Sequence, residues 1–535
     1  MKSRIRNTTS LCFTILLGLT GPATLNAQTL QDAIRMMENE QYESAAKVYE
    51  KLLSAEPSNG TVDYYYGENY FRNDMPDKAQ AMYQKGIDAS PATALNYVGL
   101  GKILYSAGNI PDANADFFKA KTISKSKSAE VFMAIADVYI NAEVKNSKEA
   151  INLLNQAIML EPKNPDIFTL MGDAYLEQND GNSAIIYYDK ALDINKKFTK
   201  AILREGKLYS RAKNYNQALD NYNKAIGIDS SFAPAFRERA ELRFRAGQPE
   251  RAAADYQKYL KLNDNISARI RYASFKFASK DYKTAIEEIN DIQKKDTSDM
   301  NLYRLAGYSY YEMGKYPDAL SNMEKFSNKA RKAGKKLVET DYEYLGKSQL
   351  KNGKDSLGAA NLNQAIQMDN SKTDLYGEIA SACMKSKNYR CAISNYEKKM
   401  FLSKDGAGAA NDYYGLGRAY YFAKDSVKAD SAFAHLIKLQ PTLPYGYLWS
   451  AFCNIKFDAD SKKGLAEPFY EKYLELAGTD LEKNKKDIIQ AYEYLGYRNM
   501  LVKNYPKAKE AWHKLKDIDP ENAKAKKALT DPNLK

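Results

Sequence analysis

Small residues recur at near-constant intervals along this chain and mark one position of a repeating pattern of apolar and polar residues. The first three, Ala45, Ala79 and Ala113, are separated by steps of 34. The series continues at Ala150, Ala184, Ala218, Ala252, Ala285, Ala319, Ala392, Ala429, Ala466 and Ala508. A period of this length is typical of a helical repeat array, in which each repeat is one pair of helices.

Larger residues stand at fixed offsets from these alanines. The frame reads Gly172, Tyr175, Ala184 and Tyr188, and then Gly206, Tyr209, Ala218 and Tyr222. We expect the small residues to let the two antiparallel helices of a pair approach closely. The tyrosines are expected to fill the angle between neighbouring pairs. Prolines such as Pro91, Pro162 and Pro441 follow the second helices, because proline prevents a helix from continuing.

This frame resembles the tetratricopeptide repeat (TPR) family. The resemblance implies an all-α fold, a right-handed superhelical solenoid of about fourteen antiparallel helix pairs that runs from about Gln28 to Pro520. Residues 521–529 follow as one further helix. We expect that helix to cap the apolar face of the last pair, because the terminal repeats of a solenoid need a polar outer surface.

The first 27 residues have the pattern of a secretory signal peptide. Lys2, Arg4 and Arg6 precede an apolar run over 11–19, and Ala27 offers a small residue before the cut. The run is too short to span a bilayer, which needs about 20 residues. The predicted domains are a signal peptide (1–27), an N-terminal TPR array of repeats 1–9 (28–327), a basic insertion (328–340), a C-terminal array of repeats 10–14 (341–520), and a capping helix and tail (521–535).

Charge and the predicted export narrow the classes of partner. The formal net charge of +12 falls by three when the signal peptide is removed, and charges of both signs are interleaved. We expect a protein of the periplasm, or of the periplasmic face of the outer membrane, of a Gram-negative bacterium. Export separates the chain from most nucleic acid, so no nucleic-acid partner is predicted. Any membrane association is expected to be indirect, through partners.

Three cysteines remain after the signal peptide: Cys383, Cys391 and Cys453. The first two fall on the facing helices of one predicted pair, so in an oxidising compartment they could form a disulfide. Two small buried thiols are the alternative, and the sequence leaves both open.

Catalytic patterns are missing from the sequence. The two histidines, His435 and His513, have no neighbour at ligand spacing, so neither a metal site nor a histidine base is predicted. Gly346-Lys347-Ser348 copies the end of a phosphate loop, but the repeat frame places it inside a helix. We therefore predict no catalytic residues, no cofactor and no enzyme activity.

The family resemblance implies that first helices line a concave groove, which receives extended peptides or partner helices. Glu130, Asp137, Asp166, Asp173 and Glu177 would form an acidic stretch of this groove, after which the sign reverses. The predicted partner-binding residues are Lys200, Arg204, Lys207, Arg211, Arg237, Phe244, Arg245, Arg271, Phe277, Arg304, Tyr308 and Tyr311.

Arginines hold carboxylates in bidentate geometry, and aromatic rings supply apolar contact area. This groove therefore predicts a protein or peptide partner with acidic segments. The alternative is an ordinary solvated face, because Glu241 is four residues from both Arg237 and Arg245 and could pair with them along the helix.

Three classes of function follow from this sequence. The favoured class is a noncatalytic exported scaffold or adaptor for protein partners, serving the assembly of outer-membrane or secreted complexes. The second is a glycan-binding receptor component associated with the outer membrane, although the chain has only short insertions and two tryptophans, Trp449 and Trp512, to stack sugars. The third is an enzyme, for which the repeat register leaves no separate catalytic domain.

Overall fold

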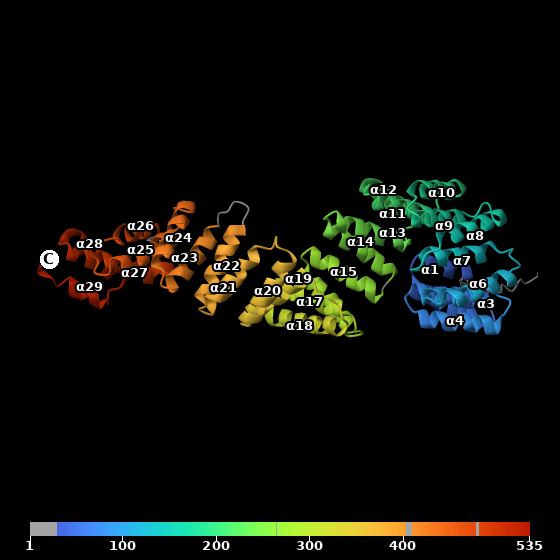
Figure 1. The fold of residues 1–535 in the computed structure, drawn as a ribbon, viewed down its shortest axis with the longest axis horizontal. Helices are drawn as coiled ribbons and strands as arrows, with labels where there is room; N and C mark the ends of the chain where they lie inside the picture. Colours follow the sequence, from blue (N-terminus) through green and yellow to red (C-terminus); the bar gives the residue numbers. More distant parts are fainter. Residues whose placement is uncertain (1–28, 264, 403–408, 478–480, 535) are drawn as a thin grey trace, which may run out of the picture. The chain divides into compact units, whose positions relative to one another are not determined.

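The computed structural model of the chain describes residues 29–263, 265–402, 409–477 and 481–534 (Figure 1). The predicted signal peptide (1–27) lies outside these residues. Within them the regular structure is helical throughout, with helices α1 to α29 and one short 3-10 helix, η1. The all-α prediction is confirmed, and α1 to α28 provide a first and a second helix for each of the fourteen predicted repeats.

The chain divides into two compact units, the first ending at Asp281 and the second beginning at Tyr282. The first helices of unit 1 are α1 (Leu30–Glu38), α3 (Gly60–Arg72), α5 (Ala94–Ser106), α7 (Ala129–Asn141), α9 (Pro165–Glu177), α11 (Thr199–Arg211), α13 (Ala233–Arg245) and α15 (Ile266–Ala278). Its second helices are α2 (Tyr42–Ala55), α4 (Pro76–Ala89), α6 (Ile110–Ile123), α8 (Ser147–Leu160), α10 (Gly181–Ile194), α12 (Tyr215–Ile228) and α14 (Pro249–Leu262).

Unit 2 continues the alternation. Its helices are α16 (Tyr282–Gln293), α17 (Met300–Glu312), α18 (Tyr316–Lys332), α19 (Glu339–Lys351), α20 (Asp355–Met368), α21 (Asp374–Lys385), α22 (Tyr389–Leu402), α23 (Ala410–Phe422), α24 (Ser426–Leu439), α25 (Pro444–Phe457), α26 (Glu467–Ala477), α27 (Leu481–Leu501), α28 (Tyr505–Ile518) and α29 (Ala523–Ala528), with η1 at Pro532–Leu534.

The thirteen alanines that recur at near-constant intervals, from Ala45 to Ala508, lie in the core of both units. None of them has exposed surface, as expected for residues at the closest approach of paired helices. Several glycines of the first helices face an aromatic ring of the second helix. A Cβ atom placed on Gly172 would lie 2.3 Å from Cε1 of Tyr188, so the ring of the same helix pair fills this space. Tyr188 is fully buried there. The equivalent Tyr83 also packs against the next pair, as expected, because a Cβ atom placed on Gly99 of α5 would lie 2.4 Å from its Cδ1.

Two helices are longer than their counterparts in the other repeats. Lys329, Arg331 and Lys332 belong to the last turn of α18, which has 17 residues where most second helices have 14, so the basic insertion begins as an extended helix. Likewise, residues 481–490 form the first half of the 21-residue helix α27. The division between the two compact units falls at Asp281.

The expected capping helix is present as α29. Ala525 of α29 and Leu534 of η1 are buried against Ala508, Trp512 and Leu515 of α28, and they cover the apolar face of the last pair. Among the described residues, none of the helices combines the length and the apolar character needed to cross a bilayer.

Candidate partner-binding groove

The first helices of unit 1 enclose a cavity of about 790 Å³, which we call the chamber. All seven helices α1, α3, α5, α7, α9, α11 and α13 contribute to its lining, together with turns beside them. This agrees with the expectation that first helices face the groove. Eight acidic and six basic side chains line the chamber, beside apolar residues such as Tyr64, Phe71 and Leu203.

Contacts between successive first helices join equivalent ends. Lys200 at the start of α11 contacts Asp166 at the start of α9, with Nζ and Oδ1 2.7 Å apart. At the other end, the Arg211 guanidinium donates to Asn179 Oδ1, just beyond α9, at 2.8 Å. The first helices therefore run parallel across the groove, and their N-terminal and C-terminal ends form two opposite rims.

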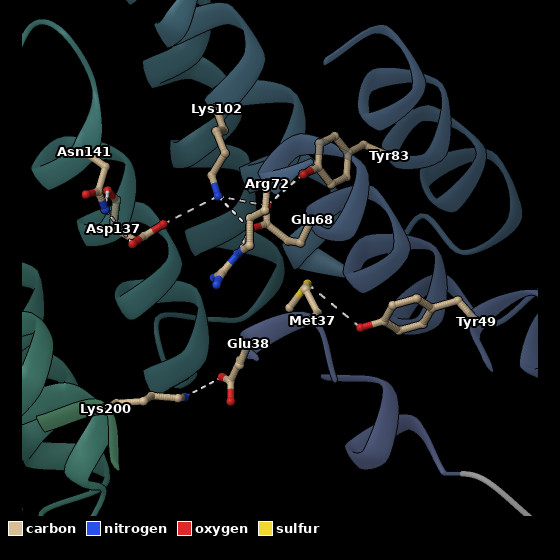
Figure 2. A network of polar contacts seen from close by, with 10 residues as sticks. All are labelled: Met37, Glu38, Tyr49, Glu68, Arg72, Tyr83, Lys102, Asp137, Asn141 and Lys200. Atoms are coloured by element: carbon tan, nitrogen blue, oxygen red, sulfur yellow. Dashed lines mark hydrogen bonds and ion pairs between the residues drawn. The ribbon is translucent and has the colours of Figure 1, made fainter. Parts of the chain in front are cut away.

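The chamber is closed by contacts between residues more than 160 positions apart. Glu38, at the end of α1, pairs with Lys200 of α11 (Figure 2). Glu40 accepts hydrogen bonds from Arg237 of α13 at 2.9 Å and from the Tyr259 hydroxyl of α14 at 2.9 Å. Asn39 and Gln41 both donate to Ser231, at 3.3 and 3.1 Å. We call this set of contacts by residues 38–41 the α1 latch.

A buried polar network lies inside the ring. Glu68 of α3 is only 3% exposed. It accepts hydrogen bonds from Lys102 Nζ at 2.7 Å and from the Tyr83 hydroxyl at 2.7 Å, and Figure 2 shows these groups pointing toward one another. Burial, together with the neighbouring Glu68 carboxylate, holds the pKa of Tyr83 well above its usual value of 10.0. The tyrosine is therefore a neutral donor to Glu68.

The sequence prediction missed Glu68, Lys102 and the latch. Glu68 and Lys102 each follow the small residue of a first helix, Gly67 and Gly101, and thus occupy a groove position of the family frame. Applying that frame to the second and third repeats would have found both residues. The latch has no comparable local signal, because its partners are separated by several repeats.

Most of the predicted basic residues in the groove are already paired with carboxylates. Lys200, Arg204, Lys207 and Arg237 line the chamber. Lys200 pairs with Glu38 and Asp166, Arg204 with Asp173, Lys207 with Glu238, and Arg237 with Glu40 and Glu238. The Asp173 carboxylate raises the pKa of Arg204 above its usual value. These cations neutralise acidic residues of neighbouring repeats, as Arg204 does Asp173, or of α1 and the residues after it, as Lys200 does Glu38.

Arg211 and Arg245 differ from the other predicted cations. They line a second cavity of about 420 Å³, which adjoins the chamber and shares Asp173, Arg204 and Lys207 with it. Arg245 donates to Ser210 Oγ at 3.3 Å and to the Glu241 carbonyl at 3.4 Å, and Arg211 donates to Asn179. With respect to the residues that the structure describes, neither arginine has a carboxylate within ion-pair distance.

The remaining predicted residues do not line these cavities. Arg271 pairs with Glu241 and lies over the rings of Phe244 and Phe275, while Phe277 is half-buried near the end of α15. Arg304, Tyr308 and Tyr311 belong to unit 2. Arg304 Nε lies 2.6 Å from Asp341 Oδ1, and both tyrosines contact the ring of Tyr344. The twelve residues are thus distributed over the two units.

Cys383 of α21 and Cys391 of α22 form a disulfide in the structure, with their Cα atoms 5.8 Å apart. They lie on the two helices of one pair, as the repeat frame indicated. Cys453 is buried as a free thiol. In the described parts of the chain, no cluster of three or more metal-ligating side chains is found.

A solenoid of paired helices, with small residues at the closest approach and first helices around a groove, defines a helical repeat protein that binds other proteins. Models of the tetratricopeptide repeat match residues 36–96, 142–198 and 203–266. The C-terminal part of a TPR repeat-containing protein from Cytophaga hutchinsonii is 35% identical over 49% of this chain and 100% of that one, with a TM-score of 0.43. The chain belongs to the tetratricopeptide repeat family.

Two further solved structures of bacterial TPR proteins are similar. One, from Parabacteroides merdae, is 20% identical over 49% of this chain and 98% of that one, with a TM-score of 0.32. The other, from Thermus thermophilus, is 19% identical over 34% of this chain and 98% of that one, with a TM-score of 0.30. No curated protein matches the chain.

Proposed function

We propose that the protein is an exported, noncatalytic TPR scaffold that holds an extended segment of a partner protein in the groove of unit 1, in the assembly of outer-membrane or secreted complexes. The chamber carries this proposal. Seven first helices surround a space of about 790 Å³ whose walls combine apolar surface with hydrogen-bonding groups. Pockets of this kind and size bind ligands by burying apolar groups and orienting polar ones.

Export is supported by the signal-peptide pattern of residues 1–27. The disulfide between Cys383 and Cys391 is compatible with it, because disulfides persist in oxidising compartments. We place the protein in the periplasm or on the periplasmic face of the outer membrane of a Gram-negative bacterium.

Acidic residues of the partner segment are proposed to bind Arg211 and Arg245. Among the described residues, the hydrogen-bond acceptors of these two arginines are neutral, so a carboxylate can reach them without displacing one of the protein's own. Arg204 and Arg237, by contrast, already hold Asp173 and Glu40. A charge-assisted bidentate contact is stronger than the neutral hydrogen bonds that it would replace.

A protein partner is favoured over a glycan by the surroundings of the tryptophans. Trp512 is only 4% exposed. Trp449 is stacked on Phe433, with ring centroids 5.7 Å apart, and is also contacted by Arg418. Sugar-binding tryptophans need an open ring face, and these two are engaged by the protein itself.

Crosslinking of the native protein in its cells, followed by mass spectrometry, identifies the partner, and a charge reversal then tests the groove. In a pull-down with the purified partner, Arg211→Glu combined with Arg245→Glu is expected to lower recovery at least about tenfold, since each charged hydrogen bond contributes about 1.5 to 3 kcal/mol. The matched control is Lys196→Glu, an exposed lysine outside both cavities. Unchanged recovery with the double variant would refute binding in this groove.

A further inference from the structure

Two acidic residues of the chamber lack a cation. Glu130 is the second residue of α7 and accepts a hydrogen bond from the Tyr65 hydroxyl. Glu161 follows α8 and accepts one from Asn164 Nδ2 at 2.8 Å. Both side chains line the chamber and are exposed to it. In the described chain neither forms an ion pair, whereas the chamber's other carboxylates, such as Asp166 and Asp173, do.

These carboxylates and the two arginines lie on opposite rims of the groove. Glu130 and Glu161 are close to the N-terminal ends of α7 and α9, while Arg211 and Arg245 are the last residues of α11 and α13. Because the first helices are parallel, the rims are separated by roughly the length of one helix. Each of these helices has 13 residues, and the twelve rises of 1.5 Å between its first and last Cα atoms amount to about 18 Å.

The pairing pattern leaves a separation of charge across the groove. All other charges that line its middle are compensated within the protein, by contacts such as Lys102 to Glu68 and Arg204 to Asp173. The charges left unpaired in the groove are therefore negative at the N-terminal rim and positive at the C-terminal rim. An extended peptide rises by about 3.3 Å per residue, so at least about five residues are needed to span the rims.

We propose that the groove of unit 1 selects an extended partner segment in which a lysine or arginine is separated by at least about five residues from one or more acidic residues. The basic residue binds Glu130 and Glu161, and the acidic residues bind Arg211 and Arg245. Lining residues between the rims, such as Leu170 and Leu203, contact the apolar side chains of the spacer. This inference rests on the proposed function and adds the arrangement of charged residues in the partner segment.

Three capped peptides of equal length test the inference by fluorescence anisotropy with the full-length protein. The first has two lysines, a neutral spacer of four residues and two glutamates. The second has glutamates at both ends, and the third has lysines at both ends. The first is expected to bind at least about tenfold more tightly than either of the others, because only it satisfies both rims. A fourth peptide with the same charges but no spacer is expected to lose this advantage.

Substitutions at each rim show which residues of the groove bind the lysines of the peptide and which bind its glutamates. Glu130→Gln with Glu161→Gln should weaken the lysine-glutamate peptide about tenfold and leave the all-glutamate peptide unchanged or more tightly bound. Arg211→Gln with Arg245→Gln should weaken the lysine-glutamate and all-glutamate peptides. The control, Asp193→Asn with Lys196→Gln, removes one charge of each sign at exposed positions outside both cavities and should change nothing.

The outcomes separate the two proposals. If the all-glutamate and lysine-glutamate peptides bind equally, and the glutamate variant has no effect, the inference is overturned while the acidic-segment proposal stands. If the lysine-glutamate and all-glutamate peptides both fail to bind the native protein, the proposed function of this groove is overturned as well. Equal binding with and without the spacer would overturn the minimum distance of about five residues between the charges.

Discussion

At the scale of single residues, the helix pairs are held together by rings that fill the space left by glycines. The ring of Tyr83 contacts Gly67, that of Tyr222 contacts Gly206, and that of Phe433 contacts Gly417. Two such tyrosines also donate to carboxylates of the groove, Tyr83 to Glu68 and Tyr188 to Asp173, both at 2.7 Å. One residue thus links the packing of a helix pair to the charge pattern of its inner face.

Gly172→Ala is expected to destabilise unit 1 by about 1 to 3 kcal/mol, because the added methyl group would overlap the buried ring of Tyr188. Gly227→Ala is the matched control. Gly227 also lies in a helix, α12, but has no atom within 4 Å of an added Cβ. It should be neutral or stabilising by up to about 1 kcal/mol. Urea unfolding followed by circular dichroism measures both, and equal midpoints would contradict the packing argument.

Glu205 of α11 gives a prediction about pH. It is 8% exposed, and burial, with Asp189 nearby, raises the pKa of its carboxyl group to about 7 from 4.5. The folded state therefore binds a proton that the unfolded state has released between these values, and this contribution to stability is lost as the pH rises from 4.5 to 7. Glu205→Gln replaces the carboxyl group by an amide that does not titrate in this range, so the stability of the variant should not fall in this way as the pH rises.

The variant should therefore gain stability relative to the native protein by about 2 to 3 kcal/mol between pH 4.5 and pH 8. Urea midpoints of both proteins at the two pH values provide the measurement. A difference that stays constant with pH would show that folding does not raise the pKa of Glu205.

At the scale of elements, the α1 latch is a polar contact between ends of the same solenoid turn. Its ion pairs are partly exposed, with 33% exposure for Arg237 and 18% for Glu40. Pairs of this kind contribute about 0 to 1 kcal/mol each and are weakened by salt. The apolar side of α1 packs elsewhere, against Val48 and Tyr49 of α2. The latch can therefore open without loss of the helix.

Arg237→Glu is expected to open the latch through repulsion with Glu40. Hydrogen exchange of the α1 amides should accelerate about 5- to 30-fold, corresponding to about 1 to 2 kcal/mol. Adding Glu40→Arg restores the pair with reversed signs and should restore much of the protection. Lys51→Glu, on the exposed side of α2, is the control. Unchanged exchange in the single variant would mean that the latch does not hold α1.

The disulfide joins the two helices of one pair in unit 2. Mass spectrometry of the unreduced protein should recover the peptides of Cys383 and Cys391 linked to each other, with Cys453 free. Replacing both linked cysteines by alanine should lower the stability of unit 2 by about 2 kcal/mol, the value expected for so short a loop. Finding both thiols free in protein taken from the cell envelope would contradict the bond.

At the scale of the whole molecule, each repeat mainly contacts its neighbours, so destabilisation should spread only within a compact unit. Gly172→Ala should accelerate hydrogen exchange in unit 1 alone. Gly417→Ala, whose Cβ would lie 2.6 Å from the Phe433 ring, should do so in unit 2 alone. Exchange measured in increasing urea distinguishes the units, and simultaneous loss of protection in both would show that they unfold as one.

Much of the fold could be predicted because its signals are local. One helix pair contains Gly172, Ala184 and Tyr188, and the spacing of these residues in the sequence already predicts that the pair is closely packed. The site could be predicted only in part. The repeat frame placed Lys200 and Arg204 in the groove, but it could not show that Glu38 and Asp173 neutralise them.

By itself the sequence determined the class of fold, the fourteen helix pairs, the buried alanines and the set of helices that faces the groove, since each depends on contacts between residues close in the chain. Tertiary structure decided which charges remain unpaired, the closure of the chamber by α1, and the division at Asp281. These depend on the small rotations between successive repeats, which accumulate along the solenoid and bring Glu40 close to Arg237. The accumulated rotation cannot be predicted from any local sequence pattern.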